Sequence, residues 1–296
     1  MIIIIPTKDR PNELIKTIDV LASNIFFFKE VIIVDSSNLQ IKKIIKEKIK
    51  NYNFNIRIID SEPSTCIQRN IGFNFIKNEE YIMFLDDDNI FYPDAFYNMQ
   101  KFLENNKEFV GVAFNQIYDY KENFFEKIKK NIILNKLGIY SSEKGGLTKS
   151  GWQSKFINFD KDMIVQWLPT RAVIYKSSAV KNIRFDDNLG IYGYLEDLDF
   201  SLELKKRGNL MVCSQAKYTH DQTVARPGFE FGKKEIKNRY YIVKKHNLSK
   251  SLFFLTALAR AILTFKNAIT GDLNSLKRLF GNFFGIISIN KLNKKS

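Results

Sequence analysis

The sequence is poor in the residues that cross-link small proteins or hold structural zinc. Its 296 residues include two cysteines, Cys66 and Cys213, which lie far apart, and two histidines. This excludes a disulfide framework and the paired spacing of a zinc site. A chain without a disulfide framework suits a reducing compartment, so we predict a cytoplasmic location.

Long apolar runs are also missing. No stretch reaches 18 uncharged apolar residues, so we expect no transmembrane helix. The segment Met1–Pro6 lacks the basic and apolar regions of a signal peptide, and we expect none. Hydrophobic residues make up 45% and charged residues 26% of the chain, which excludes disordered, collagen-like and coiled-coil proteins.

Acidic residues are scarce at the end of the chain. From Gly228 onward there are fourteen lysines and arginines against three acids, whereas residues 1–227 carry 32 bases and 29 acids. The net charge of +14 therefore resides mainly in the last 69 residues. This change predicts a first domain over residues 1–227 and a basic amphipathic helical extension over residues 228–296.

Short apolar strands alternate with helical patterns in the first 115 residues. The predicted strands are Ile2–Ile5, Glu30–Asp35, Asn55–Asp60, Tyr81–Leu85 and Phe109–Phe114. The predicted helices are Pro11–Leu21, Leu39–Ile49, Thr65–Ile76 and Pro93–Leu103. This alternation is typical of βαβ units and predicts an α/β fold with a mostly parallel, Rossmann-like sheet flanked by helices. Such sheets bind ligands at the carboxyl ends of their strands.

The pattern is less regular after residue 115. We interpret Gln116–Lys161 as a variable insertion. A helix is predicted over Leu195–Arg207 and a strand over Leu210–Ser214. The basic extension predicts three helices, which are Phe231–His246, Leu252–Thr270 and Leu273–Ile287.

Three consecutive acids, Asp86, Asp87 and Asp88, follow the predicted strand Tyr81–Leu85. Adjacent carboxylates repel one another unless a cation or solvent screens them. If the chain stays extended, Asp86 and Asp88 point to the same side and can hold a hard divalent cation. The alternative is an ordinary acidic turn at the end of a strand.

Two further groups carry chemistry in the later part of the chain. Glu196 and Asp197 begin a predicted helix, where an ionised carboxylate can accept a proton from a hydroxyl nucleophile or can merely stabilise the helix. His220, just past a predicted strand, can be a third metal ligand or a hydrogen-bonded loop residue.

Polar residues also follow the first strands. Thr7 and Arg10 lie between a strand and a helix, where backbone N–H groups and basic side chains favour an anion. Asp35 ends the second strand and can accept a hydrogen bond from a base or a ribose. Arg69, on the third predicted helix, is a candidate ligand for a phosphate or a base.

Five segments in this order resemble glycosyltransferase family 2. They are Ile5–Pro11, Val31–Ser37, Gln68–Gly72, Phe84–Asp88 and Leu195–Asp199. The resemblance covers about residues 1–222. It implies a GT-A fold and inverting transfer from a nucleotide-diphosphate sugar, with Mg²⁺ or Mn²⁺ as cofactor. The nucleotide-binding half would span about residues 1–115, and the acceptor half about residues 116–227.

The resemblance also implies a donor pocket. Thr7, Arg10, Asp35 and Asp60 would line the nucleotide, and Arg69 would approach the base or the phosphates. Two segments depart from the usual pattern, because Asp-Ser-Ser replaces Asp-Asp-Gly-Ser and Gln-Arg-Asn replaces Ala-Arg-Asn. Both departures leave the identity of the nucleotide open.

The metal site follows from the same resemblance. Asp86 and Asp88 match the Asp-x-Asp motif, which binds the metal and meets the donor. Asp87 between them would belong to the donor site, and His220 matches the place of a further metal ligand.

On the acceptor side, Asp197 matches the base that deprotonates the acceptor hydroxyl, with Glu196 beside it. Aromatic residues nearby can stack on a sugar ring or can belong to the core. The candidates are Trp167 and Tyr194, with Trp152 and Tyr192 as further possibilities.

The two C-terminal predicted helices combine phenylalanine and leucine with lysine and arginine. We predict that residues 249–296 bind an anionic membrane surface, and that the protein is peripheral on the inner face of the cell membrane. The acceptor would be a glycan or a lipid-linked molecule in bacterial surface polysaccharide or glycolipid synthesis. The alternative is that these helices pack on the catalytic core or in a homodimer.

Two other functions compete with glycosyl transfer. A sugar nucleotidyltransferase usually carries a glycine-rich loop after its first strand, and Pro6–Pro11 contains no glycine. A basic protein that binds nucleic acid or a membrane without catalysis is the other alternative. We expect no nucleic-acid partner, because the basic residues accompany long apolar helices.

Overall fold

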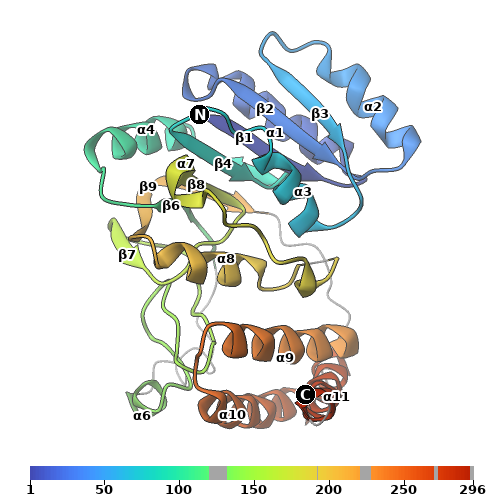
Figure 1. The fold of residues 1–296 in the computed structure, drawn as a ribbon, viewed down its shortest axis with the longest axis vertical. Helices are drawn as coiled ribbons and strands as arrows, with labels where there is room; N and C mark the ends of the chain where they lie inside the picture. Colours follow the sequence, from blue (N-terminus) through green and yellow to red (C-terminus); the bar gives the residue numbers. More distant parts are fainter. Residues whose placement is uncertain (120–131, 192, 221–227, 270–272, 294–296) are drawn as a thin grey trace. The chain divides into compact units, whose positions relative to one another are not determined.

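The computed structural model describes residues 1–119, 132–191, 193–220, 228–269 and 273–293. The chain divides into two compact units, Met1–Asp119 with Phe156–Asp221 and Tyr120–Lys155 with Gln222–Ser296 (Figure 1). The predicted domain boundary at residue 227 lies outside the described residues and stays a prediction.

The first unit is built on a sheet. Its described strands are β1 (Ile2–Thr7), β2 (Glu30–Asp35), β3 (Ile56–Asp60), β4 (Tyr81–Leu85), β5 (Asn89–Phe91), β6 (Gly111–Gln116), β7 (Met163–Val165), β8 (Ala172–Lys176) and β9 (Leu210–His220). They follow the order β3-β2-β1-β4-β8-β6-β9-β5, and β7 also pairs with β9. Strands β1, β2, β3, β4, β6 and β9 run in one direction, and β5, β7 and β8 run against it. The sheet is therefore mostly parallel, as predicted.

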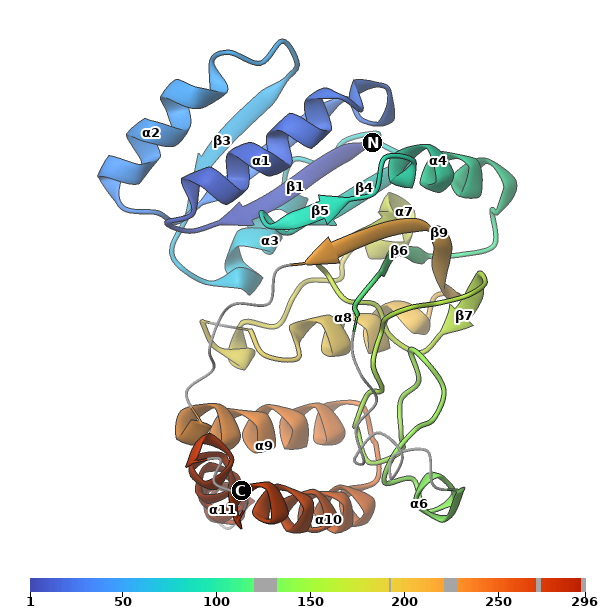
Figure 2. The ribbon, with the colours of Figure 1, turned by 180° about the vertical axis from the view of Figure 1, so that it is seen from behind.

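Helices cover both faces of this sheet (Figure 2). They are α1 (Pro11–Ala22), α2 (Leu39–Ile49), α3 (Thr65–Phe73), α4 (Ala95–Asn105), α7 (Ser177–Val180) and α8 (Glu196–Lys205). Ile3 and Ile5 of β1 join the core cluster that contains α1, α2 and α4. Ile4 points to the other face and touches Gly72 of α3 so closely that a Cβ atom there would overlap it. Burial on both faces explains why the β1 sequence is continuously apolar.

Several boundaries differ from the sequence prediction by a few residues, and two of these differences have a clear cause in the structure. Pro93 lies in a turn before α4, which begins at Ala95, because the Ala95 N–H donates to the carbonyl of Tyr92 (3.0 Å). The last predicted strand is longer than expected, because β9 shifts its register beside Phe114 and Asn115 and then pairs with β5. His220 is therefore the last residue of β9 and not a loop residue.

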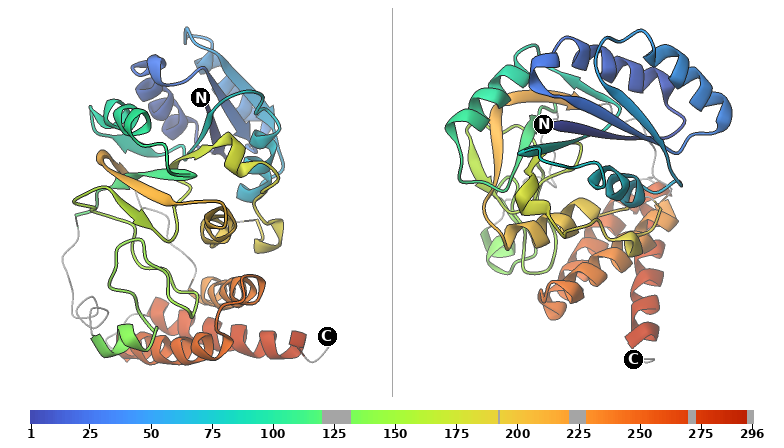
Figure 3. Two further views of the ribbon diagram at one scale, coloured as in Figure 1. Left: turned by 60° about the vertical axis from the view of Figure 1, so that its left-hand side comes forward. Right: turned by 45° about the horizontal axis from the view of Figure 1, so that its top comes forward.

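The second unit is helical. Its described helices are α6 (Ile132–Lys136), α9 (Gly228–Lys245), α10 (Lys250–Ile269) and α11 (Leu273–Asn293). The three longer helices agree with the predicted ones, and Figure 3 shows α9 lying along one side of α10 and α11. Their shared core contains Trp152, Ile236, Tyr240, Val243, Phe253, Ala257 and Ile289. No helix in the described part of the chain is long and apolar enough to cross a membrane.

Glycines bring α9 and α11 unusually close. Gly228 and Gly232 are spaced four residues apart on α9, and Gly281 and Gly285 have the same spacing on α11. A Cβ atom at Gly281 would overlap the carbonyl of Phe229, and one at Gly285 would lie 2.9 Å from the Cβ of Ile236. Side chains at these positions would force the two backbones apart.

Candidate active site

The strand ends of the first unit bring the predicted site residues to one edge of the sheet. Thr7, Asp35 and Asp60 end β1, β2 and β3, and Asp35 in the middle is the register partner of both Thr7 and Asp60. Asp86 directly follows β4, and His220 ends β9. Since these strands are parallel, their carboxyl ends meet at the same edge, as the sequence predicts.

The three consecutive aspartates are directed to different partners. Asp86 Oδ1 pairs with Arg69 (3.1 Å), and Asp87 Oδ1 and Asp88 Oδ2 both pair with Arg10 (2.9 and 2.8 Å). The turn between β4 and β5 is fixed by Asn89, whose amide donates to the carbonyls of Asp86 (3.2 Å) and Arg171 (2.8 Å). Two guanidinium groups thus offset much of the repulsion between the three carboxylates.

Asp86, Asp88 and His220 form a candidate metal site. Each contributes one ligand atom, and these atoms lie within 4.8 Å of one another. Asp88 Oδ1 lies 3.2 Å from His220 Nδ1, and both atoms are buried without a hydrogen-bond partner among the described residues. Burial lowers the pKa of His220, and Arg171 lowers it further, so the neutral imidazole is favoured. Two carboxylates and a neutral imidazole fit Mn²⁺ or Mg²⁺.

Asp87 points away from this group. Its Oδ2 accepts a hydrogen bond from Thr7 Oγ1 (2.6 Å), and its backbone carbonyl accepts one from Thr17 Oγ1 (2.9 Å). Burial raises the pKa of Asp87 to about 7, although Thr7 and Arg10 favour the ionised form. The residue therefore joins the acidic turn to β1 and α1.

Arg69 joins the acidic turn to the predicted base. Its Nη2 contacts Asp86, and its Nη1 contacts Glu196 Oε1 at 2.6 Å. The guanidinium lies 5.4 Å from the centre of the Phe185 ring, and the side chain is 3% exposed. The helix that carries it, α3, is capped by Ser64, whose Oγ accepts from the N–H of Ile67 (3.4 Å). A rigid helix therefore holds one buried cation between two carboxylates.

Glu196 and Asp197 lie in the first turn of α8, as the sequence predicts. Glu196 accepts hydrogen bonds from Arg69 and from Thr170 Oγ1 (3.3 Å). Asp197 Oδ1 accepts from the N–H of Leu198 (2.8 Å), and its Oδ2 has no partner among the described residues. Glu196 accepts both of its hydrogen bonds at Oε1, so each of the two acids keeps one oxygen without a partner among the described residues.

The environment of this pair favours the protonated forms. Burial and the charge of Asp197 raise the pKa of Glu196 to about 7, against the opposing effect of Arg69. Burial also raises the pKa of Asp197, while the N–H of Leu198 and the charge of Arg171 favour its ionised form. A carboxylate whose pKa is raised toward neutrality is a stronger base than an exposed one.

The backbone before α8 is strained. Leu195, at the N-cap, has a left-handed conformation with φ 75°, and its side chain is buried. Such a conformation costs on the order of 1–3 kcal/mol for a residue other than glycine and persists where packing imposes it. Packing of Leu195 thus sets the direction of Glu196 and Asp197.

Asp35 and Asp60 have different surroundings, although both end neighbouring strands. Asp35 is fully buried, its Oδ1 accepts from the N–H of Ser37 (2.8 Å), and its Oδ2 has no hydrogen-bond partner in the part of the chain that the structure describes. Asp60 is exposed and pairs with Lys42 at 2.8 Å, which lowers its pKa. Asp35 therefore has the unsatisfied oxygen expected of a ligand-binding residue, and Asp60 does not.

The aromatic candidates are mostly core residues. Trp167 is 7% exposed, and its ring lies edge-on to Phe156 with centroids 5.6 Å apart. Trp152 belongs to the second unit, where it stacks on Phe253. Tyr194 is half-buried two residues before Glu196, and Tyr192 lies outside the described residues.

Sequence reasoning assigned no role to Thr170 and Arg171. They lie at the site because β8 runs antiparallel to β4, which puts its first residues beside the carboxyl end of β4. Arg171 Nη1 donates to Gln116 Oε1 (3.1 Å), and its carbonyl accepts from the N–H of Asp86 (2.7 Å). The signal that could have found them is their position as a polar pair directly before the mostly apolar strand Ala172–Lys176.

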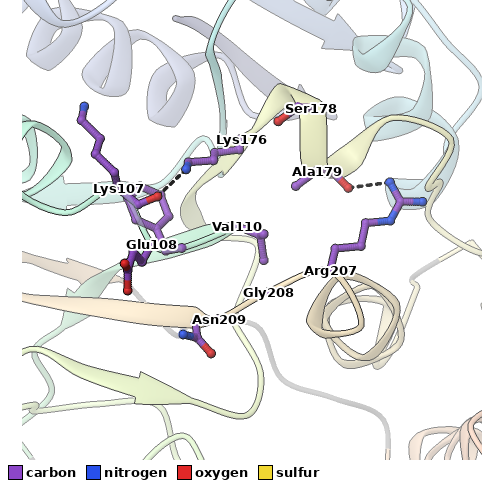
Figure 4. Close-up of a pocket in the computed structure, with 10 residues that line it drawn as sticks. Lys107, Glu108, Val110, Lys176, Ser178, Ala179, Arg207, Gly208 and Asn209 are labelled. Atoms are coloured by element: carbon purple, nitrogen blue, oxygen red, sulfur yellow. Dashed lines mark hydrogen bonds between the residues drawn. The ribbon is translucent and has the colours of Figure 1, made fainter.

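A cavity of about 430 Å³ lies at the opposite edge of the sheet (Figure 4). It is lined by Lys107, Glu108, Phe109, Val110, Lys176, Ser178, Ala179, Arg207, Gly208 and Asn209. Val110 and Asn209 precede β6 and β9, so the cavity adjoins the amino ends of these strands. It is separate from the acidic site, and its basic side chains Lys176 and Arg207 already donate to backbone carbonyls.

Solved structures with a similar fold include several glycosyltransferases. One is S. aureus TarS 1-349 in complex with UDP-GlcNAc, with TM-score 0.53 and 16% identity over 85% of this chain and 70% of that chain. A second is GalNAc-T7 with UDP, GalNAc and Mn²⁺, with TM-score 0.58 and 13% identity over 82% of this chain and 47% of that one. A third is the mannosyltransferase PcManGT from Pyrobaculum calidifontis in complex with GDP-Man and Mn²⁺, with TM-score 0.55 and 12% identity over 100% and 87% of the two chains. At these identities the similarity establishes the fold, which is the expected GT-A fold.

The sequence comparisons give the family. No curated protein matches the chain. The family model described as Glycosyl transferase family 2 matches residues 2–164, which is more than half of the 296 residues. The match includes four of the five segments that carried the resemblance. The chain therefore belongs to glycosyltransferase family 2.

Proposed function

We propose that the protein is a metal-dependent, inverting glycosyltransferase. It would transfer a sugar from a nucleotide-diphosphate sugar to a hydroxyl of a glycan or lipid-linked acceptor, in bacterial surface polysaccharide or glycolipid synthesis. The observation that carries the proposal is the buried contact of Arg69 with both Asp86 and Glu196. Sugar transfer requires a site for the donor diphosphate next to a base for the acceptor, and this arginine joins the two.

The donor would bind along the carboxyl ends of β1 and β2. The free Oδ2 of Asp35 is suited to accept a hydrogen bond from a ribose or a base. Thr7 is the register partner of Asp35, and Arg10, which contacts Asp87 and Asp88, would face the phosphates. The structural neighbours that contain UDP-GlcNAc and GDP-Man support a nucleotide sugar as the donor class.

Asp86, Asp88 and His220 would hold the divalent cation. When bound, Mn²⁺ or Mg²⁺ supplies positive charge that stabilises the diphosphate leaving group. Arg10 contacts Asp87 and Asp88 and would keep this turn in place while the diphosphate leaves.

Asp197 would act as the base on the acceptor side. Its free Oδ2 would take the proton of the acceptor hydroxyl while that oxygen attacks the anomeric carbon and the bond to the diphosphate breaks. Glu196 would hold Arg69 in place and raise the basicity of its neighbour. One displacement inverts the anomeric configuration and requires no enzyme nucleophile.

Nucleotide binding tests this proposal. We expect one of UDP, GDP, dTDP or CDP to raise the melting temperature when Mn²⁺ or Mg²⁺ is present and not when EDTA is present. At 100 times the dissociation constant the stabilisation is about 2.7 kcal/mol, which corresponds to roughly 5–10 °C. Asp88→Asn should abolish the shift.

The matched control is Asp94→Asn, an exposed acid before α4 whose side chain does not cap the helix. It should leave the shift unchanged. Absence of any shift with all four nucleotides would refute the proposed donor site. A shift followed by release of pyrophosphate from a sugar phosphate and a nucleoside triphosphate would indicate a nucleotidyltransferase instead.

A further inference from the structure

Helices α10 and α11 each carry two apolar faces. The inner faces pack against α9: Phe253 of α10 lies 5.4 Å from the ring centre of Tyr240, and Gly281 and Gly285 of α11 touch α9. Helices that only complete a helical core need one such face. The second face of each helix therefore requires another explanation.

The outer faces form regular stripes. The stripes consist of Leu255, Leu258, Ile262 and Phe265 on α10, and Leu273, Phe280, Phe283 and Ile287 on α11, with exposed fractions between 37% and 71%. Phe284 is also 49% exposed, but its ring contacts Phe229 of α9, so it is not counted in the stripe. We name these eight residues the docking face. Their spacing of three, four or seven residues places each set on one side of its helix. Each stripe lies away from the residues that contact α9, and they extend about 15 and 21 Å along their helices.

The charges around the docking face have one sign. Neither Lys250–Ile269 nor Leu273–Asn293 contains an aspartate or a glutamate, and together they carry Lys250, Arg260, Lys266, Lys277, Arg278 and Lys291. Lys250 and Lys277 are exposed. Arg278 is paired with Glu235 inside the unit, so it is less available to a partner.

We infer that the docking face binds the surface of an anionic lipid bilayer, with α10 and α11 lying in the plane of the interface. Phenylalanine, leucine and isoleucine would enter the boundary of the acyl chains, and the lysines would meet the headgroups. Neither helix is long and apolar enough to span the bilayer, which favours the in-plane arrangement among the described helices. Pairing with a second copy is disfavoured, because it would bring like charges together.

Docking of this kind would concentrate the enzyme on the membrane, where a lipid-linked acceptor resides. The choice of acceptor rests on the proposed glycosyltransferase function, whereas bilayer binding does not. Binding is therefore measured without nucleotide or acceptor. Its failure leaves the nucleotide thermal shift intact, and loss of that shift leaves bilayer binding intact.

The experiment is flotation of the full chain with vesicles of phosphatidylcholine alone or with 30% phosphatidylglycerol, at low and high salt. We expect binding to the anionic vesicles, weakened by salt, and at least tenfold weaker binding to the neutral ones. Each charge near such a surface changes affinity by about fivefold. Leu258→Asp with Phe283→Asp adds two negative charges and removes two apolar contacts, so we expect at least about a 100-fold loss.

The matched control adds the same charge without removing apolar contacts from the docking face. It combines Leu39→Asp with Ser251→Asp, which replace exposed residues of α2 and α10. Its affinity for the anionic vesicles should fall by no more than about fivefold. Circular dichroism and melting temperature verify folding of both variants. Equal binding to both vesicle types, or equal losses in the variant and the control, would overturn the inference. A dimer that the Leu258→Asp, Phe283→Asp variant dissociates would also overturn it and assign the face to a second copy.

Discussion

Arg69 offers the sharpest test of how the candidate active site is held together. Replacing it with methionine keeps much of the apolar stem and removes the contacts to Asp86 at 3.1 Å and Glu196 at 2.6 Å. The side chain is 3% exposed, so water does not readily replace the guanidinium. Breaking a buried ion pair from one side typically costs about 3–5 kcal/mol.

The loss of unfolding free energy should lie at the lower end of that range and should depend on pH. The pKa of Glu196 is raised to about 7, and without Arg69 it rises further, so this carboxyl can relieve the loss by taking a proton. We expect a decrease in unfolding free energy of about 3 kcal/mol at pH 8, which is roughly 6–12 °C in melting temperature. The difference from wild type should shrink as the pH falls toward about 7, because Glu196 of the variant takes up a proton at a higher pH than that of wild type, and it should change little below that pH.

The assay combines melting curves with a double-mutant cycle. Arg69→Met, Glu196→Gln and their combination should show a coupling energy of about 1–3 kcal/mol. Arg57→Met is the control, because it breaks an ion pair with Glu30 whose side chains are far more exposed (45% and 22%), and it should cost under about 1 kcal/mol. The reasoning is wrong if Arg69→Met costs no more than this control, or if the two changes at Arg69 and Glu196 are additive at pH 8.

Three further predictions follow from other parts of the chain. The rate of sugar transfer should fall as the pH drops through about 7, because burial and the charge of Asp197 raise the pKa of Glu196 to about 7 and its protonation weakens its hold on Arg69. Glu196→Gln cannot take up this proton and removes a like charge beside the base Asp197, so the acidic limb of the rate should move to lower pH; an unchanged limb would contradict the assignment. Glu235→Gln should lower the unfolding free energy by about 1–3 kcal/mol at pH 7, because Arg278 loses its partner. Burial alone would raise the pKa of Glu235, but Arg278 and two other arginines outweigh burial and lower it. Wild-type stability in thermal melts should therefore decrease below about pH 4 and approach that of the variant. Gly281→Ala should lower the unfolding free energy by about 1–3 kcal/mol in thermal melts, despite the better helix propensity of alanine, because the new Cβ atom would overlap α9. Ser288→Ala in the same helix is the control and should have little effect. A stabilised Gly281→Ala protein would show that α9 and α11 are not in close contact.

Much of the fold could be predicted because the relevant signals are local. Neighbouring residues alone define the apolar runs that form β1, β2, β3 and β4. They also define the helical spacing of apolar residues between these strands. Parallel strands then place Thr7, Asp35 and Asp86 at one edge of the sheet without further information. The family segments could be recognised for the same reason, because each lies within a few residues of a strand end or a helix start.

Side-chain partners could not be predicted in the same way. Asp35 and Asp60 end adjacent strands with similar sequences, yet one is buried with a free oxygen and the other is exposed beside Lys42. Asp87 stands between two candidate metal ligands and turns to Thr7 instead. These differences depend on which neighbouring strand or helix covers each residue.

The α/β pattern, the positions of the carboxylates along the chain and the basic character of the C-terminal helices follow from the order of the amino acids alone. Tertiary structure alone decided that Arg69 meets Glu196, 127 residues away, and that antiparallel β8 brings Thr170 and Arg171 to the site. It also decided that α10 and α11 keep an apolar face exposed after packing on α9. Local periodicity encodes helices and strands, whereas pairing across the sheet depends on strand order and burial, which no short window of sequence contains.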